Sequence, residues 1–335
     1  MTRPAHHRPA GGFRNPWPTD EPHGLRDFLR WTILGRLAGT RPRGVSRADF
    51  AAAFPRATPA PTRPRAAPDR LLATWVGHST FLLQIGGLNV LTDPVWGERA
   101  SPVPFAGPRR WASPGLALDA LPPVDLVLVS HDHYDHLDEP TVRRLARRDP
   151  AARWLAPLGV ASWLRRRGVA LVEERDWWET ASVGGATLTC VPAQHFSGRR
   201  ATNRNATLWC GWTVRAGARS AYYVGDTGYF PDVADAARRG GGPFDLVLMP
   251  VGAYDPRWFM RPVHNDPADA VRAYRELAAA APGPPAVMAG MHWGTFKLTD
   301  ESMDDPPRRT REAWAAAGLP PELLWMPAHG ETKEL

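Results

Sequence analysis

The sequence predicts an α/β fold in which strands and helices alternate along most of the chain. Short runs rich in apolar and β-branched residues recur between residues 71 and 291, and runs with helical spacing of apolar residues lie among them. The chain has 335 residues, of which 43% are hydrophobic, so it can bury one large core or two modest ones without disulfides. We therefore expect a packed α/β domain preceded by a less regular segment.

Residues 1–70 are predicted to form that segment, an N-terminal arm rich in proline, arginine and alanine. Its prolines at residues 55–64 predict an extended connector, because proline disrupts a helix. A short amphipathic helix is expected earlier in the arm, where these residues recur at helical spacing: Leu25, Phe28, Leu29, Thr32, Ile33 and Leu37. Arginines elsewhere on this helix leave two interpretations, packing on its own domain, which we favour, or contact with an anionic membrane surface.

Residues 71–335 are predicted to form the catalytic domain, which opens with strands at 72–75, 81–85 and 88–92 around a Gly86-Gly87 turn. No repeat of 20 to 50 residues follows. Further strands are expected at 124–130, 186–192, 207–214, 220–225, 245–250 and 285–291. Helices are expected at 141–148, 159–167, 267–281 and 307–317.

A dense histidine cluster directly follows the strand expected at 124–130. It contains His131, His133, Asp135 and His136. Neutral imidazole is a common ligand of divalent transition metals, and a carboxylate adds a charged oxygen donor. Residues at alternate positions of an extended chain point the same way, so His131 and His133 are expected to bind one ion and the other two, beyond a bend, a second. The spacing therefore predicts two metal ions.

This cluster resembles the motif that begins the dinuclear site of the metallo-β-lactamase superfamily of metallohydrolases. His195, Asp226 and His292 each follow a strand-like run and supply the remaining ligands in the expected order. The resemblance implies an αββα sandwich and two zinc ions per chain, with Asp226 bridging them. It assigns one ion to His131, His133 and His195, and the other to Asp135, His136 and His292.

The segments around these residues resemble one branch, the phospholipase D that hydrolyses N-acylphosphatidylethanolamine. The resemblance covers about residues 71–335 and is carried by residues 75–80, 91–94, 194–200, 205–209, 252–260 and 292–296, with a weaker match at 12–18. It implies a phosphodiesterase that cleaves the distal phosphate ester of the lipid and releases N-acylethanolamine and phosphatidic acid.

Several further residues receive expected roles near the metals. Asp135 is expected to direct the proton of the nucleophile, and His264, which matches a histidine of the resembled branch, to protonate the leaving group or bind phosphate. Asp93 is expected to accept the N–H of a ligating imidazole, or simply to form a turn before Pro94. His78 either supports the ligands or caps the first hairpin. An apolar substrate wall is expected from Trp293, Tyr254 and Trp258, although tryptophan is more often found in a core.

Two other classes of function stay open. The same ligands serve lactonases and other metal-dependent hydrolases of small, phosphorylated substrates, and a non-catalytic metal-binding or membrane-adaptor protein would also retain the fold. A ribonuclease would carry an RNA-binding insertion, which is not evident. The expected partners are a phospholipid or a small phosphodiester and a peripheral membrane contact.

The net charge is +7, and nearly all the basic residues are arginine, since lysine occurs only at Lys297 and Lys333. The arginine runs carry no interleaved aromatic residues, so nucleic-acid binding is not expected. Cys190 and Cys210 lie in apolar runs and are expected to be buried and reduced. No apolar stretch approaches a membrane span and no secretory signal is evident, so we expect a cytoplasmic protein, with peripheral contact to the membrane as a further option.

Overall fold

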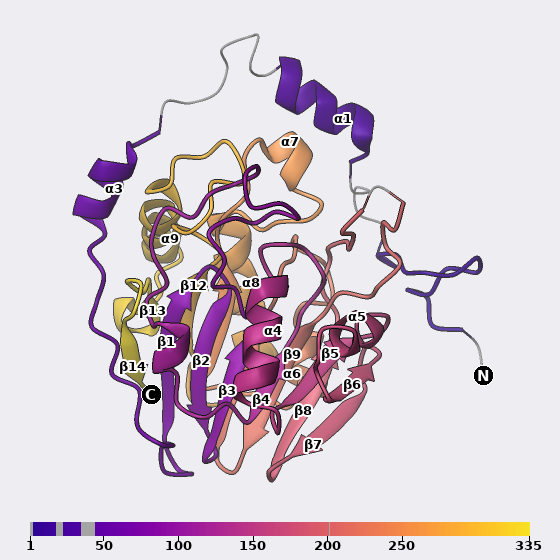
Figure 1. Cartoon of the computed structure of the whole chain (residues 1–335). Coiled ribbons are helices and arrows are strands. Elements are labelled where there is room, and N and C mark those ends of the chain that lie inside the picture. The colour runs from indigo at the N-terminus through magenta and orange to yellow at the C-terminus, as the bar shows by residue number, and fades with distance from the viewer. Residues whose placement is uncertain (1–2, 18–22, 35–43, 201) are drawn as a thin grey trace.

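The computed structural model describes residues 3–17, 23–34, 44–200 and 202–335. Its centre consists of two seven-stranded sheets packed face to face, with helices on both outer faces (Figure 1). The order of layers is therefore helix, sheet, sheet, helix. This confirms the αββα sandwich that the sequence predicted.

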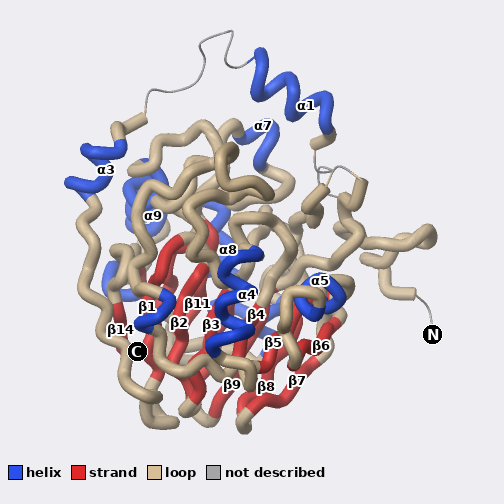
Figure 2. The backbone as a smooth tube through the Cα atoms, in the orientation of Figure 1, coloured by secondary structure: helices blue, strands red, loops and turns tan. Residues whose placement is uncertain are grey.

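In each sheet, three antiparallel pairings adjoin three parallel ones. The first sheet contains, in spatial order, β14 (Thr332–Glu334), β1 (Leu71–Gly77), β2 (Thr80–Ile85), β3 (Leu88–Thr92), β4 (Leu126–Leu128), β5 (Arg153–Pro157) and β6 (Leu171–Arg175). The second contains β13 (Leu324–Trp325), β12 (Val287–Met291), β11 (Leu246–Pro250), β10 (Arg219–Tyr223), β9 (Gly211–Ala216), β8 (Ala186–Val191) and β7 (Thr180–Val183). The parallel strands of a sheet end at the same edge, and the long loops gather there (Figure 2).

Helices cover the outer face of each sheet. The first sheet carries α4 (Glu139–Arg148) and α5 (Ala161–Arg165), and the second carries α6 (Asp235–Gly240), α8 (Pro267–Ala280) and α9 (Asp305–Ala316). Short elements complete the loops: α7 (Arg257–Met260), the 3-10 turns Leu118–Ala120 and Pro321–Leu323, and, in the arm, α1 (Leu25–Leu29), the π-helical turn Arg30–Leu34 and α3 (Arg47–Ala53). None of the described helices is long and apolar enough to cross a membrane.

The largest core lies between the sheets. Trp75, Phe81, Trp212 and Tyr223 are fully buried there, because alternate residues of each strand face the opposing sheet. A second core joins α4 and α5 to the outer face of the first sheet through residues such as Leu145. Cys190 and Cys210 are buried and form no disulfide.

The described part of the N-terminal arm packs along the rest of the chain. Phe13 is buried, Phe50 of α3 packs against Trp111, and Trp31 donates a 2.6 Å hydrogen bond to Asp300. The predicted amphipathic helix is present over 25–34, and Leu37 lies outside the described residues. The division of the chain at residue 70 stays a prediction.

Candidate metal centre

The predicted site residues converge at the edge where the parallel strands end. Asp93 follows β3, and the histidine loop, residues 129–138, follows β4. In the second sheet His195 comes after β8, Asp226 after β10 and His292 directly after β12. The face-to-face packing of the sheets thus brings side chains from both of them to one place.

One group of donor atoms contains His131, His133 and His195. His131 Nε2 lies 2.8 Å from His133 Nδ1, and His195 Nε2 lies 3.3 Å from the same atom. His131 and His195 are buried. Three imidazole nitrogens that face one another this closely can bind one divalent ion.

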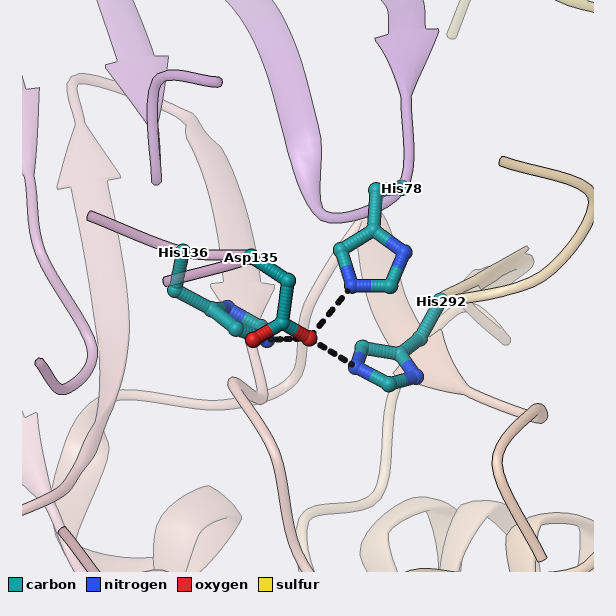
Figure 3. A group of neighbouring side chains, drawn as sticks. All are labelled: His78, Asp135, His136 and His292. Carbon is teal, nitrogen blue, oxygen red and sulfur yellow. Dashed lines mark hydrogen bonds and ion pairs between the residues drawn. The ribbon is translucent and has the colours of Figure 1, made fainter. Parts of the chain in front are cut away.

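A second group contains His78, Asp135, His136 and His292 (Figure 3). Its centre is Asp135 Oδ2, which lies 2.9 Å from His78 Nε2, 3.5 Å from His136 Nε2 and 3.4 Å from His292 Nε2. The turn between β1 and β2 carries His78, so the first hairpin supplies one wall of this group.

Asp226 lies between the two groups. Its Oδ2 atom is 3.1 Å from His136 Nε2 and 3.0 Å from His292 Nε2, and 3.8 Å from His195 Nε2 on the other side. A carboxylate in this position faces donors of both groups, as a bridging ligand must.

Several of these buried atoms have no hydrogen-bond partner among the described residues: His136 Nε2, His292 Nδ1 and Nε2, Asp226 Oδ1 and His264 Nδ1. The Nε2 atoms of His136 and His292 lie close to Asp226 Oδ2, but the angles at these contacts do not meet those of a hydrogen bond. Leaving buried polar atoms unsatisfied is costly, and a cation at their meeting point removes that cost. The His and Asp donors therefore suit divalent metal ions.

Electrostatics divides the histidines into two sets. Burial, followed by neighbouring imidazoles, lowers the pKa of His131 well below its usual range and that of His133 to about 3. Burial also opposes charge on His292 and His136, but nearby carboxylates, chiefly Asp226, outweigh it. They raise the pKa of His292 to about 9 and that of His136 well above its usual range. Metal binding at the second set must therefore displace protons.

Supporting hydrogen bonds orient the imidazoles. Asp93 Oδ2 lies 2.6 Å from His136 Nδ1, the contact expected for Asp93, and the carboxylate also accepts from the Ser130 amide at 2.7 Å. His195 Nδ1 donates to the carbonyl of Val263 at 2.8 Å. With Nδ1 occupied, Nε2 of His136 and His195 faces the centre.

His264 stands next to these donors. Its ring centre is 5.1 Å from that of His195 and 5.2 Å from that of His292, and its Nδ1 is 4.0 Å from Asp226 Oδ2. Burial lowers the pKa of His264 well below its usual range, so the side chain is neutral near pH 7. The structure thus places it beside the predicted ligands.

The three aromatic residues expected to form a substrate wall have different environments. Trp293 is buried in the core against Trp75, and Tyr254 is fully buried and donates a hydrogen bond to Asp305 at 2.7 Å. Both rings are packed, Trp293 against the core and Tyr254 against α9, and their expected role in a substrate wall stays a prediction. Trp258 of α7 is 45% exposed.

Strained backbone accumulates around the centre. His78, Asp93 and His292 adopt φ values of 56°, 26° and 64°, a region that non-glycine residues rarely occupy. Such strain persists only where the surroundings hold it, and it is common at functional sites.

The sequence did not point to the residues that brace the histidine loop from outside. Arg199 Nη1 donates to the carbonyls of Asp132 and Leu137, and Asp132 Oδ1 accepts from the Gly198 amide. A cavity of about 1240 Å³ opens beside this brace, lined partly by Tyr134, Arg167 and Arg199. The only local signal was the Gly198-Arg199-Arg200 segment, whose arginines resemble the many other arginines of the chain.

Comparison with known proteins places this geometry in a family. The model of the Beta-lactamase superfamily domain matches residues 88–293. An uncharacterized protein of Mycobacterium tuberculosis is 42% identical over 289 residues, 85% of this chain and 73% of that protein. N-acyl-phosphatidylethanolamine-hydrolyzing phospholipase D 1 of Caenorhabditis elegans is 39% identical over 252 residues, 72% of this chain and 69% of that enzyme.

A solved structure shows the same fold at lower identity. A possible metal-dependent hydrolase of Veillonella parvula superposes with a TM-score of 0.61 and 20% identity, covering 79% of this chain and all of that one. The domain match, the relatives and the converging His and Asp donors agree with one another. The chain belongs to the metallo-β-lactamase superfamily and is a metal-dependent hydrolase of that group.

Proposed function

We propose that the protein is a dinuclear zinc phosphodiesterase of phospholipase D type, which hydrolyses lipids like N-acylphosphatidylethanolamine to N-acylethanolamine and phosphatidic acid. The observation that carries the hydrolase part is the position of Asp226 Oδ2, 3.0 to 3.8 Å from imidazoles of both donor groups. The similarity to the nematode phospholipase D over 72% of the chain supports the choice of substrate.

The seven predicted ligands would hold the two ions as the resemblance to the family implies: His131, His133, His195, Asp135, His136, His292 and the bridging Asp226. Zinc suits this donor set of imidazoles and carboxylates without cysteine. Bound ions would lower the pKa of a water molecule towards neutrality and stabilise the charge that develops on the phosphate. Asp93 would keep His136 in the tautomer that leaves Nε2 free for the ligand role.

Two side chains would handle protons. Asp135 Oδ2 faces the interior, and its carboxyl pKa stays well below the usual range, because His136 and the other imidazoles outweigh the effect of burial. It would direct the proton of the attacking water through a hydrogen bond to the ionised carboxylate. His264, whose Nδ1 lies 4.0 Å from Asp226 Oδ2, would bind the phosphate as a neutral imidazole, or protonate the leaving group once the charge of the bound phosphate raises its pKa.

The end of the molecule that carries the metal centre would contact the lipid surface. There α1 and α7 lie above the sheets (Figure 1). Phe28, Leu29 and Ile33 of the arm are 44 to 51% exposed, and Trp258 of α7 is 45% exposed. Exposed apolar side chains beside Arg26 and Arg30 suit an anionic membrane surface, which supports peripheral membrane contact. The cytoplasmic location remains the expectation from the sequence.

A substrate panel tests the proposal. The zinc-loaded protein is assayed against bis-p-nitrophenyl phosphate, vesicles that contain N-acylphosphatidylethanolamine, and a set of lactones. We expect phosphodiester and lipid turnover that falls at least about 10³-fold in Asp226→Ala and His292→Ala, since metal-assisted hydrolysis depends on the ligands. Asp119→Ala serves as control, because its side chain is 83% exposed.

Each other outcome identifies an alternative. Turnover of lactones alone would overturn the phosphodiesterase assignment in favour of the lactonase. No turnover by a protein that still binds two zinc ions would favour the adaptor.

A further inference from the structure

Another cluster of possible metal ligands lies outside the metal centre, where the N-terminal arm meets the domain. His6 Nε2 is 2.7 Å from Asp176 Oδ1, and His7 Nε2 is 2.7 Å from Asp176 Oδ2. The donor atoms of His6, His7 and Asp176 all lie within 4.8 Å of one another, as do those of the His131, His133 and His195 group.

The backbone of the arm turns both histidines toward one carboxylate. The amide of His7 donates to the carbonyl of Pro4 at 3.0 Å, and His7 pairs with Phe13 across a short β-bridge. His6 stacks on Trp177, with ring centres 4.2 Å apart, which fixes the direction of its Nε2. Asp176 directly follows β6, so the domain presents its carboxylate from the end of a strand.

Two imidazoles and one carboxylate are a donor set of zinc and of related transition ions. His6 is almost fully buried, whereas the side chains of His7 and Asp176 are 26% and 17% exposed. A cation can therefore enter from solvent, and water can complete its coordination. We propose that His6, His7 and Asp176 form a third divalent-metal site, specific for zinc or a similar transition ion, that fastens the arm to the catalytic domain.

The position of this site connects it to the centre. Further along the same arm, Asn15 donates a 3.0 Å hydrogen bond to the carbonyl of His195, one of the predicted ligands. Trp17 stacks on Trp177 and donates to Asp232 at 2.6 Å. An ion at His6 and His7 would hold the arm in the place where Asn15 touches the centre.

Zinc counting tests the site without any assay of activity. Untagged protein is dialysed to equilibrium against zinc, and bound metal is measured by elemental analysis. We expect His7→Gln to bind one zinc ion fewer per chain than wild type, because glutamine keeps a hydrogen bond to Asp176 but is a poor zinc ligand. His23→Gln is the matched control from the same arm and should bind as much as wild type.

The same difference of one ion is expected when His7→Gln is added to Asp226→Ala and His292→Ala, so the result does not depend on the proposed function. Trypsin gives a second readout. Arg3 and Arg8 precede proline, which leaves Arg14 as the cleavable arginine of this segment. Zinc should slow cleavage after Arg14 in wild type and not in His7→Gln. Equal zinc content in both proteins, with cleavage independent of zinc, would show that the three residues form only a hydrogen-bonded tether.

Discussion

Arg199 and Tyr134 hold each other across the outer side of the histidine loop. The Tyr134 hydroxyl donates to the Arg199 carbonyl at 2.8 Å, and the guanidinium lies 4.0 Å from the centre of the Tyr134 ring. The same guanidinium donates to the carbonyls of Asp132 and Leu137, at 2.8 Å and 2.7 Å. Tyr134 lies between the predicted ligands His133 and Asp135 in the sequence. Its contact with Arg199 therefore holds the loop from outside, while the side chains of His133 and Asp135 face the centre.

Replacing Arg199 should therefore weaken metal binding. Arg199→Ala removes the hydrogen bonds to both loop carbonyls, and loss of such outer contacts commonly lowers metal affinity about 10- to 100-fold. Zinc affinity is measured by competition with a chromophoric chelator. Arg200→Ala, the exposed neighbour, is the control and should bind like wild type. Equal affinity in the two variants would contradict the bracing role.

Asp93 offers a test of the tautomer assignment. Asp93→Asn keeps the size of the side chain but removes the charge that receives the Nδ1–H of His136. We expect the affinity for one of the two ions to fall about 10- to 100-fold while the other changes less. Stepwise zinc titration by calorimetry, made in the His7→Gln background to leave out the proposed third site, separates the two ions. An unchanged titration would mean that Asp93 acts only in the turn before Pro94, and Asp119→Asn controls for loss of a surface charge.

The fold was largely predictable because the central strands are continuous apolar runs. The predicted strand 88–92 matches β3, and the prediction for 245–250 is one residue longer than β11. β5, β6, β7, β13 and β14 were missed. In β6, Glu173, Glu174 and Arg175 interrupt the apolar pattern at the edge of the sheet. Helix α3 was missed although Ser46 caps it by accepting from the Asp49 amide, a signal that was present in the sequence.

The site was predictable in part for a different reason. The histidine loop is local in sequence, and its ligand spacing is informative by itself. His195, Asp226 and His292 are distant from it, so only the resemblance to a family connected them with the loop. No local pattern links His7 to Asp176, which is 169 residues away. Long-range contacts of this kind depend on how the arm packs, and the periodicity of the arm does not encode that.

The metal-free protein should become less stable as pH rises above neutrality. Burial opposes the charge on His292, but Asp226 and Asp135 raise its folded-state pKa from 6.5 to about 9. Between these values the folded state binds more protons than the unfolded state, so this contribution is complete below about pH 6.5 and is lost as pH rises through about 9. Urea unfolding of chelator-treated protein at pH 7 and pH 8.5 measures the loss.

Two comparisons check the origin of this dependence. His292→Gln should show a smaller decrease in the free energy of unfolding between the two pH values. Zinc-loaded protein should not show the decrease, because zinc binds the neutral imidazole. Greater stability of the metal-free wild type at pH 8.5 would contradict the assigned charge states.

Gly225 should be essential for the position of Asp226, the residue that follows it. Its φ is 69°, and a Cβ at this position would lie 2.6 Å from the carbonyl oxygen of Cys210 and 3.0 Å from Ser130 Cβ. Gly217, with φ of 61° and no atom within 4 Å of the place where a Cβ would stand, is a matched control. Gly217→Ala should cost only the left-handed backbone penalty of about 1–2 kcal/mol. Gly225→Ala should cost a further ~1–3 kcal/mol from overpacking and should weaken zinc binding, because relief of the clash moves Asp226 away from the imidazoles.

Denaturation curves and zinc titrations of both variants measure these effects. Equal stability and equal zinc affinity would show that the backbone before Asp226 can shift without moving its carboxylate.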